Sequence, residues 1–171
     1  MRGEELKRLI GTELALVRDA RVVDQVRSAL IEPYAIMRGW DYGVAGQQYL
    51  CWMVLNDSAT GAEIAFCDEG FGPRCPWGLV SSGKDRTMGP DSGWYTTFMA
   101  AYFESWACTV LPIWRVLRIG SDGVESPLSD EGKWDSTWRA VKRLQQDDPA
   151  GRYNCGHSVL YGKPGANSGA V

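Results

Sequence analysis

The stretch "QQYLCWMVLNDSATGAEIAFCD", Gln47 to Asp68, decides the fold. Its two ends, "QQYLCWMVLND" and "AEIAFCD", are rich in aromatic and branched residues, and "NDSATG" between them has the composition of a turn. This pattern predicts a β-hairpin. The predicted sheet is built around this hairpin.

On the N-terminal side, apolar residues recur at helical spacing from Glu4 to Leu30, which predicts one long helix or two short ones that end before Pro33. On the C-terminal side, "RCPWGLVSSG" predicts a further strand, and Pro76 either confines it to an edge of the sheet or delays its start to Trp77, because proline cannot donate to a central ladder. "PDSGWYTTFMAAYFESWA" then predicts a helix with Asp91 or Ser92 as its N-cap. Its predicted apolar stripe is Trp94, Phe98, Ala101, Tyr102 and Trp106.

The remaining third of the chain continues with strands in "LPIWRVLRIG", "VESPLS" and "HSVLYG" and with a helix in "WDSTWRAVKRLQQ". Strands that follow one another through short turns favour antiparallel pairing. The sequence therefore predicts an α+β fold. We expect a mainly antiparallel sheet of five to seven strands, with an N-terminal helix and two further helices packed on it. We also expect one domain over residues 1–161 and a flexible tail over 162–171, where Gly, Ala and Ser are frequent.

Composition excludes several classes of function. The 171 residues carry a net charge of -3, which does not suit a general binder of nucleic acid or of anionic membranes. The N-terminus has no signal-peptide pattern, and the apolar run Tyr49 to Leu55 is far shorter than a membrane span. Five cysteines, an odd number, are typical of reduced thiols, so we expect a cytoplasmic protein.

Acidic residues gather in the middle of the chain. Between Ile31 and Gly72 the single cation Arg38 stands against six acids, namely Glu32, Asp41, Asp57, Glu63, Asp68 and Glu69. Such a segment indicates either a solvated face or an acidic surface for a basic partner.

Three kinds of chemistry were weighed for the cysteines and acids. A zinc site from Cys67, Cys75, Cys155 and His157 lacks the close ligand pairs of structural zinc sites. A thiol nucleophile is limited to His157 as base, because the chain has one histidine, with Asn154 or Asp68 to orient it. Paired carboxylates could act in hydrolysis, but acids in glycine-rich loops more often form turns and caps. We therefore assign no catalytic residue, no metal ligand and no cofactor.

The segments "CDEGFGPRCPWGLV" and "MGPDSGWY" share glycines and prolines that fix the backbone, together with acids and aromatic rings. That combination is typical of recognition surfaces, where aromatic anchors lie inside a polar rim, and also of loops that close a core. The predicted partner-binding residues are Trp40, Asp41, Asp68, Glu69, Phe71, Trp77, Asp91 and Trp94.

A small, acidic, Trp-rich α+β chain with "GFGPRCPWGLV" followed by "MGPDSGWYTTFMAAYFES" resembles the immunity proteins of bacterial polymorphic toxin systems. The likeness covers about Trp40 to Trp114 and transfers no catalytic or binding residue. It implies a non-enzymatic protein that neutralises a cognate toxin, often a basic nuclease, by covering its active site or a nearby surface. The alternatives are a small hydrolase with a Cys/His or paired-carboxylate site, and a small-ligand module with a Trp-lined pocket.

Overall fold

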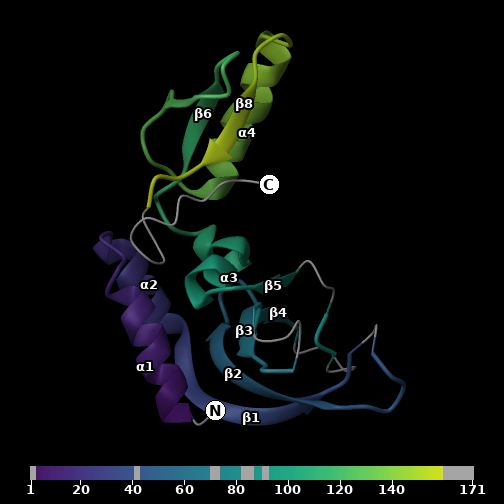
Figure 1. Cartoon of the computed structure of the whole chain (residues 1–171). Coiled ribbons are helices and arrows are strands. Elements are labelled where there is room, and N and C mark those ends of the chain that lie inside the picture. Colours follow the sequence, from purple (N-terminus) through teal and green to yellow (C-terminus); the bar gives the residue numbers. More distant parts are fainter. Residues whose placement is uncertain (1–2, 41–42, 70–73, 82–86, 90–92, 160–171) are drawn as a thin grey trace. The chain divides into compact units, whose positions relative to one another are not determined.

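A computed structural model of the chain describes residues 3–40, 43–69, 74–81, 87–89 and 93–159. These residues form four α-helices and two antiparallel sheets, one of five strands and one of three (Figure 1). The predicted α+β class is confirmed. The predicted tail, residues 162–171, lies outside the described residues.

The described chain forms two compact units, residues 3–108 and Thr109–Val159. This differs from the single domain that we expected over residues 1–161. The sequence gives no sign of the division, because the chain passes from one unit to the next through "TVLPIW" rather than a polar linker. Leu111 and Ile113 in that segment are buried, so it has the composition of a core segment.

Helix α1 (Gly3–Leu14) and helix α2 (Ala20–Ala29) open the first unit, so the N-terminal pattern forms two helices. Leu6, Ile10 and Leu14 form the buried stripe of α1. Asp19 caps α2, since its side chain accepts a hydrogen bond from the Arg21 amide at 3.0 Å. Pro33 does not end the helix, because α2 stops at Ala29.

Five strands follow in the order β1 (Leu30–Arg38), β2 (Tyr49–Asp57), β3 (Ala62–Phe66), β4 (Trp77–Val80) and β5 (Trp94–Tyr95). Every neighbouring pair is antiparallel, and the predicted hairpin is β2 and β3. In its turn, Asp57 accepts hydrogen bonds from the Ala59 amide and the Thr60 hydroxyl, and Gly61 has a φ of +73° that suits glycine. Pro33 lies in β1, the first strand of the sheet, where the register with β2 shifts between Leu30 and Tyr34.

The two faces of this sheet are both apolar. On one face, Phe66 and Trp77 meet edge to face, and Trp77 meets Phe98 of α3 (Phe98–Glu104) in the same way. On the other face lies a second cluster around Cys51, Met53, Cys67, Met88 and Trp94. Because both faces are buried at its centre, the sheet has apolar residues at successive positions of β2 and β3 rather than a simple alternation.

Helix α3 begins later than predicted. Its N-cap is Thr97, which accepts from the Ala100 amide at 3.0 Å, whereas the predicted caps Asp91 and Ser92 lie outside the described residues. The carboxylate of Glu13, from α1, accepts from the Phe98 and Met99 amides at 3.2 and 2.9 Å. A residue 85 positions away therefore completes the cap. Short helix η2 (Trp106–Cys108) follows α3.

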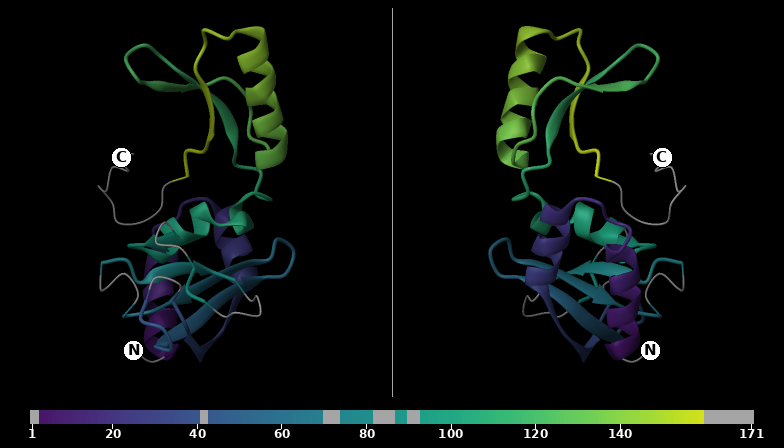
Figure 2. Two further views of the ribbon diagram at one scale, coloured as in Figure 1. Left: turned by 90° about the vertical axis from the view of Figure 1, so that its right-hand side faces the viewer. Right: turned by 90° about the vertical axis from the view of Figure 1, so that its left-hand side faces the viewer.

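The second unit joins β6 (Arg115–Ile119), β7 (Glu125–Pro127) and β8 (Tyr153–Gly156) in a sheet with β6 in the middle. Helix α4 (Trp134–Asp147) lies along β6 and β8 (Figure 2). Val116 and Val141 are buried, as the predicted periodicities require. Strand β8 starts earlier than the predicted "HSVLYG" and ends before His157.

Candidate functional site

The loops that carry the predicted site meet at one end of the five-stranded sheet. The antiparallel register places the end of β1, the start of β2 and the end of β3 on the same side. The connection between β4 and β5 returns to this end, where Thr87 bridges Gly39 and the Met88 amide donates to the Gly39 carbonyl at 2.8 Å. The topology therefore brings together segments that are far apart in sequence.

Arg38 fixes this arrangement from inside the protein. Its side chain is 3% exposed, and its Nη1 donates to the carbonyls of Ser81 and Thr87 at 2.9 and 3.1 Å. Its Nη2 lies 3.6 Å from the sulfur of Met53, while Nε has no hydrogen-bond partner. Within the described residues Arg38 forms no ion pair with a carboxylate, and its buried guanidinium is held by the Ser81 and Thr87 carbonyls and by the Met53 sulfur.

The structure describes two of the four acids that were predicted to bind a partner. Asp68 and Glu69 are exposed directly after β3, as expected of a surface, whereas Asp41 and Asp91 lie outside the described residues. Asp57 and Glu63 do not contribute to an acidic surface, because they are 7% and 6% exposed at the far end of the β2–β3 hairpin. The six acids counted along the sequence therefore do not form one continuous face.

The predicted aromatic anchors are mostly internal. Trp77 and Trp94 were predicted as partner-binding residues of loops that either form a recognition surface or close the core. They are 1% and 6% exposed, so their rings close the core and are not available to a partner in this structure. Gly78 explains the burial of Trp94, since a Cβ at that position would lie 2.6 Å from its ring. Trp40 is half-buried and meets Tyr49 edge to face at 6.2 Å. Phe71 lies outside the described residues.

Exposed apolar side chains that the sequence analysis missed lie beside the two placed acids. Met37 of β1 pairs directly with Leu50 of β2, and they are 45% and 46% exposed. Continuing the β2–β3 register places Asp68 across from Leu50. Val44, in the connection between β1 and β2, is 70% exposed. We call Met37, Val44, Leu50, Asp68 and Glu69 the hairpin patch.

The signal for the hairpin patch was present in the sequence. In "YLCWM", Cys51 and Met53 face the core, so Leu50 must face the other way. The side chains on both faces of this strand are apolar. Hydrophobicity along the sequence therefore does not distinguish the face that stays buried to the end of the strand from the face that becomes exposed.

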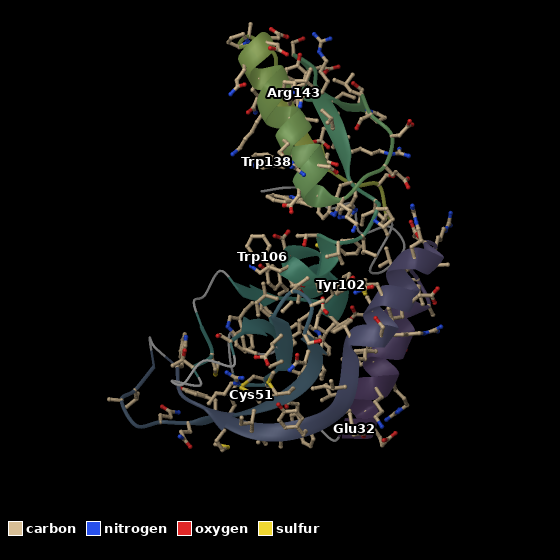
Figure 3. The ribbon with its side chains drawn as sticks, turned by 180° about the vertical axis from the view of Figure 1, so that it is seen from behind. Glu32, Cys51, Tyr102, Trp106, Trp138 and Arg143 are labelled. Atoms are coloured by element: carbon tan, nitrogen blue, oxygen red, sulfur yellow. The ribbon has the colours of Figure 1, made fainter. Side chains whose placement is uncertain are left out.

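Trp106 is a second exposed ring. It was predicted to lie in the apolar stripe of α3, but α3 ends at Glu104 and Trp106 begins η2 with 65% of its surface exposed (Figure 3). The change from α-helix to 3₁₀-helix at Ser105 rotates Trp106 out of the stripe.

The cysteine and histidine of the second unit do not have the protonation properties of a catalytic pair. Burial raises the pKa of the Cys155 thiol to about 11 and lowers the pKa of His157 to about 4. His157 packs edge to face on Trp114 at 5.1 Å. A thiolate nucleophile needs a lowered thiol pKa, which is opposite to the shift at Cys155.

A groove of about 430 Å³ lies between α1, α2 and β1. Ile10, Leu14 and Val54 contribute its apolar surface, and Lys7 pairs with Glu32 at 2.7 Å on its rim. None of its described lining residues is a tryptophan, so it is not the Trp-lined pocket of the small-ligand alternative.

The described residues contain no group of three or more His, Cys, Asp or Glu that could hold a metal ion. The same part of the chain contains no helix of the length and apolarity needed to cross a bilayer. No protein-family model matches the sequence, and neither a curated protein nor a solved structure is similar to it.

Proposed function

We propose that this chain is a non-enzymatic binding protein that neutralises a cognate protein toxin, basic and nuclease-like, by covering its active site or a nearby surface. The observation that carries the proposal is the hairpin patch, in which an exposed apolar pair, Met37 and Leu50, lies beside the exposed acids Asp68 and Glu69. An apolar centre with a charged rim is the common anatomy of a protein interface.

The charge of the loops agrees with a basic partner. By sequence, the segments 39–48, 67–76 and 81–93 contain five acids and three bases. A nuclease must present Lys and Arg to bind phosphates, and acids on its inhibitor increase the association rate and the specificity. In this proposal the Met37 and Leu50 side chains give most of the affinity and the carboxylates steer the encounter.

The proposal includes a cytoplasmic location, because an immunity protein must meet its toxin where the toxin acts. The hydrolase alternative receives less support, since burial raises the pKa of Cys155 and lowers that of His157.

The test is co-expression with the protein encoded by the reading frame next to this gene. We expect a stable 1:1 complex and relief of that protein's toxicity. If the neighbouring product is harmless, or if it is toxic and does not bind this chain, the proposal is wrong.

Variants of the hairpin patch then locate the interface. We expect Leu50→Ala to weaken binding about tenfold, because one central apolar side chain contributes more than about 1 kcal/mol. We expect the double variant Asp68→Lys and Glu69→Lys to slow association and to reduce the salt dependence of the rate. Asp24→Lys on α2 is the matched control, since Asp24 is an exposed acid of the same unit and does not belong to the patch. If the control variant changes binding as much as the patch variants do, the interface does not lie on the hairpin patch.

A further inference from the structure

The core cluster below the loop end of the large sheet is unusually rich in sulfur. Five of its twelve side chains are Cys or Met, namely Cys51, Met53, Cys67, Met88 and Cys75. Cys51 and Cys67 are both 0% exposed, and Figure 3 shows Cys51 within the sheet. Burial alone accounts for cysteines in a core, since a thiol behaves there as a small apolar group. It does not account for their mutual position.

Cys51 and Cys67 face each other across neighbouring strands. Trp52 pairs with Phe66 and Met53 with Ala65, so the next step of the same register pairs Cys51 with Cys67. Both side chains belong to the same cluster and therefore lie on the same face of the sheet. The two thiols interact, since the neighbouring Cys67 raises the pKa of the Cys51 thiol.

The hydrogen bonding of Cys67 shows which kind of antiparallel pair this is. Its amide donates to the Pro76 carbonyl at 2.9 Å, on the side of β4, and therefore points away from β2. Cys51 and Cys67 thus occupy a non-hydrogen-bonded position of the ladder, where the Cα atoms are about 4.5 Å apart and side chains approach most closely. That separation lies within the range of about 4.4–6.8 Å that a disulfide spans.

We propose that Cys51 and Cys67 are a cross-strand dithiol that a low-molecular-weight disulfide, such as oxidised glutathione, converts into an intramolecular disulfide. The site is separate from the hairpin patch, whose Leu50 and Asp68 lie on the opposite face of the sheet. It does not depend on the proposed toxin.

The reaction balances as two thiol–disulfide exchanges. The thiolate of one cysteine attacks a sulfur of oxidised glutathione, which forms a mixed disulfide and releases one glutathione thiolate. The second protein thiolate then attacks the protein sulfur of the mixed disulfide and releases the second glutathione. The protein loses two protons and two electrons, and the oxidant becomes two molecules of reduced glutathione.

The surroundings of the pair set its reactivity. Contact with Cys67 and burial raise the pKa of Cys51, while the positive charge of Arg38 opposes this rise. The net pKa of Cys51 is raised, so Arg38 offsets the rise only in part and the thiolate is scarce while the pair is buried. Because both sulfurs are buried, the oxidant reaches them only when this part of the sheet opens, so oxidation is slower than at an exposed thiol.

Cys75 is the competing partner to be distinguished. It is half-buried and packs against the same cluster, so its sulfur is the most accessible of the three to solvent. The ladder places Pro76, and not Cys75, opposite Cys67. We therefore expect the bond at equilibrium to join Cys67 to Cys51.

The experiment equilibrates the full-length protein with mixtures of reduced and oxidised glutathione, blocks the remaining thiols by alkylation and maps linked peptides by mass spectrometry. We expect a peptide pair joining Cys51 to Cys67 and no reaction at Cys108, a matched cysteine that is 1% exposed. The triple variant Cys75→Ala, Cys108→Ala, Cys155→Ala should form the same bond, because it retains both thiols.

The bond should also stabilise the fold. Closing a loop of this length raises the melting temperature by on the order of 5–10 °C, and Cys51→Ala or Cys67→Ala should abolish the rise while Cys108→Ala should not. The proposal is overturned if excess oxidised glutathione yields no Cys51–Cys67 peptide both in buffer and in mild denaturant that opens the sheet. A predominant Cys67–Cys75 link, or a lower melting temperature after oxidation, also overturns it.

Discussion

Replacing Glu13 by Ala removes an acceptor that α1 supplies to the first turn of α3. The carboxylate accepts hydrogen bonds from the Phe98 amide at 3.2 Å and from the Met99 amide at 2.9 Å. Hydrogen bonds to a charged group contribute about 1.5–3 kcal/mol each, so the two bonds together contribute about 3–6 kcal/mol before other costs.

The partial burial of the carboxylate reduces this sum. Loss of hydration raises the pKa of Glu13, although the bonds from the Met99 and Phe98 amides act to lower it. Dehydration thus opposes the charged form, but Glu13→Ala also leaves the Phe98 and Met99 amides without this acceptor, at a cost of about 1–3 kcal/mol for each amide. We therefore expect a net loss of about 2 kcal/mol for Glu13→Ala. Glu13→Gln retains one acceptor oxygen and should lose about half as much.

Amide hydrogen exchange is the most direct assay, because it reports on α3 itself. A loss of 2 kcal/mol corresponds to exchange at Phe98 and Met99 that is about 30-fold faster. Glu4→Ala is the control, since Glu4 is an exposed acid of the same helix and pairs only with Lys7. Unchanged exchange in Glu13→Ala, or an equal loss in Glu13→Gln, would refute the assignment of Glu13 as the cap.

Three further variants test the packing and the pH dependence. Tyr102→Phe should leave stability unchanged or raise it by up to about 1 kcal/mol, because the buried hydroxyl has no hydrogen-bond partner in the described structure; a loss above 1 kcal/mol in chemical denaturation would contradict this. Gly78→Ala should cost about 1–3 kcal/mol in the same measurement, since the new Cβ would overlap the Trp94 ring, whereas Gly39→Ala has open space and should be tolerated. In the folded protein His157 has a pKa of about 4, whereas in the unfolded chain its pKa is near the ordinary value of 6.5. Between these two pH values the unfolded chain binds a proton that the folded protein does not, so acidification favours unfolding. Melting temperatures at about pH 7 and pH 5 should therefore differ less in His157→Gln than in the wild type, and an equal difference would show that His157 is not the group responsible.

The elements encoded by local sequence were predicted well. The hairpin of β2 and β3 needs only two apolar runs and a turn with Asp57 and Gly61, all within twenty-two residues of sequence. The buried stripe of α1 likewise follows from spacing along one helix. Such features do not depend on distant parts of the chain.

The features that were missed depend on distant partners. Thr97 caps α3 because Glu13 fixes where that helix begins, and no pattern near residue 97 contains this information. Trp94 turns inward because Gly78 of the neighbouring strand leaves room for its ring. Within the predicted site, this explains why exposed acids were recognised while the direction of two tryptophan rings was not.

Pro33 has a consequence for the solubility of the protein. In the described structure β1 pairs only with β2, so its other side offers backbone groups to which a strand from another molecule could add. Pro33 removes one donor from this strand, and the shift of register between Leu30 and Tyr34 bends it locally. A flat, regular edge is thereby avoided beside the apolar side chain of Met37. The exposed Met37 therefore lies on a strand whose irregular edge is a poorer template for strand addition from another molecule than a flat edge would be.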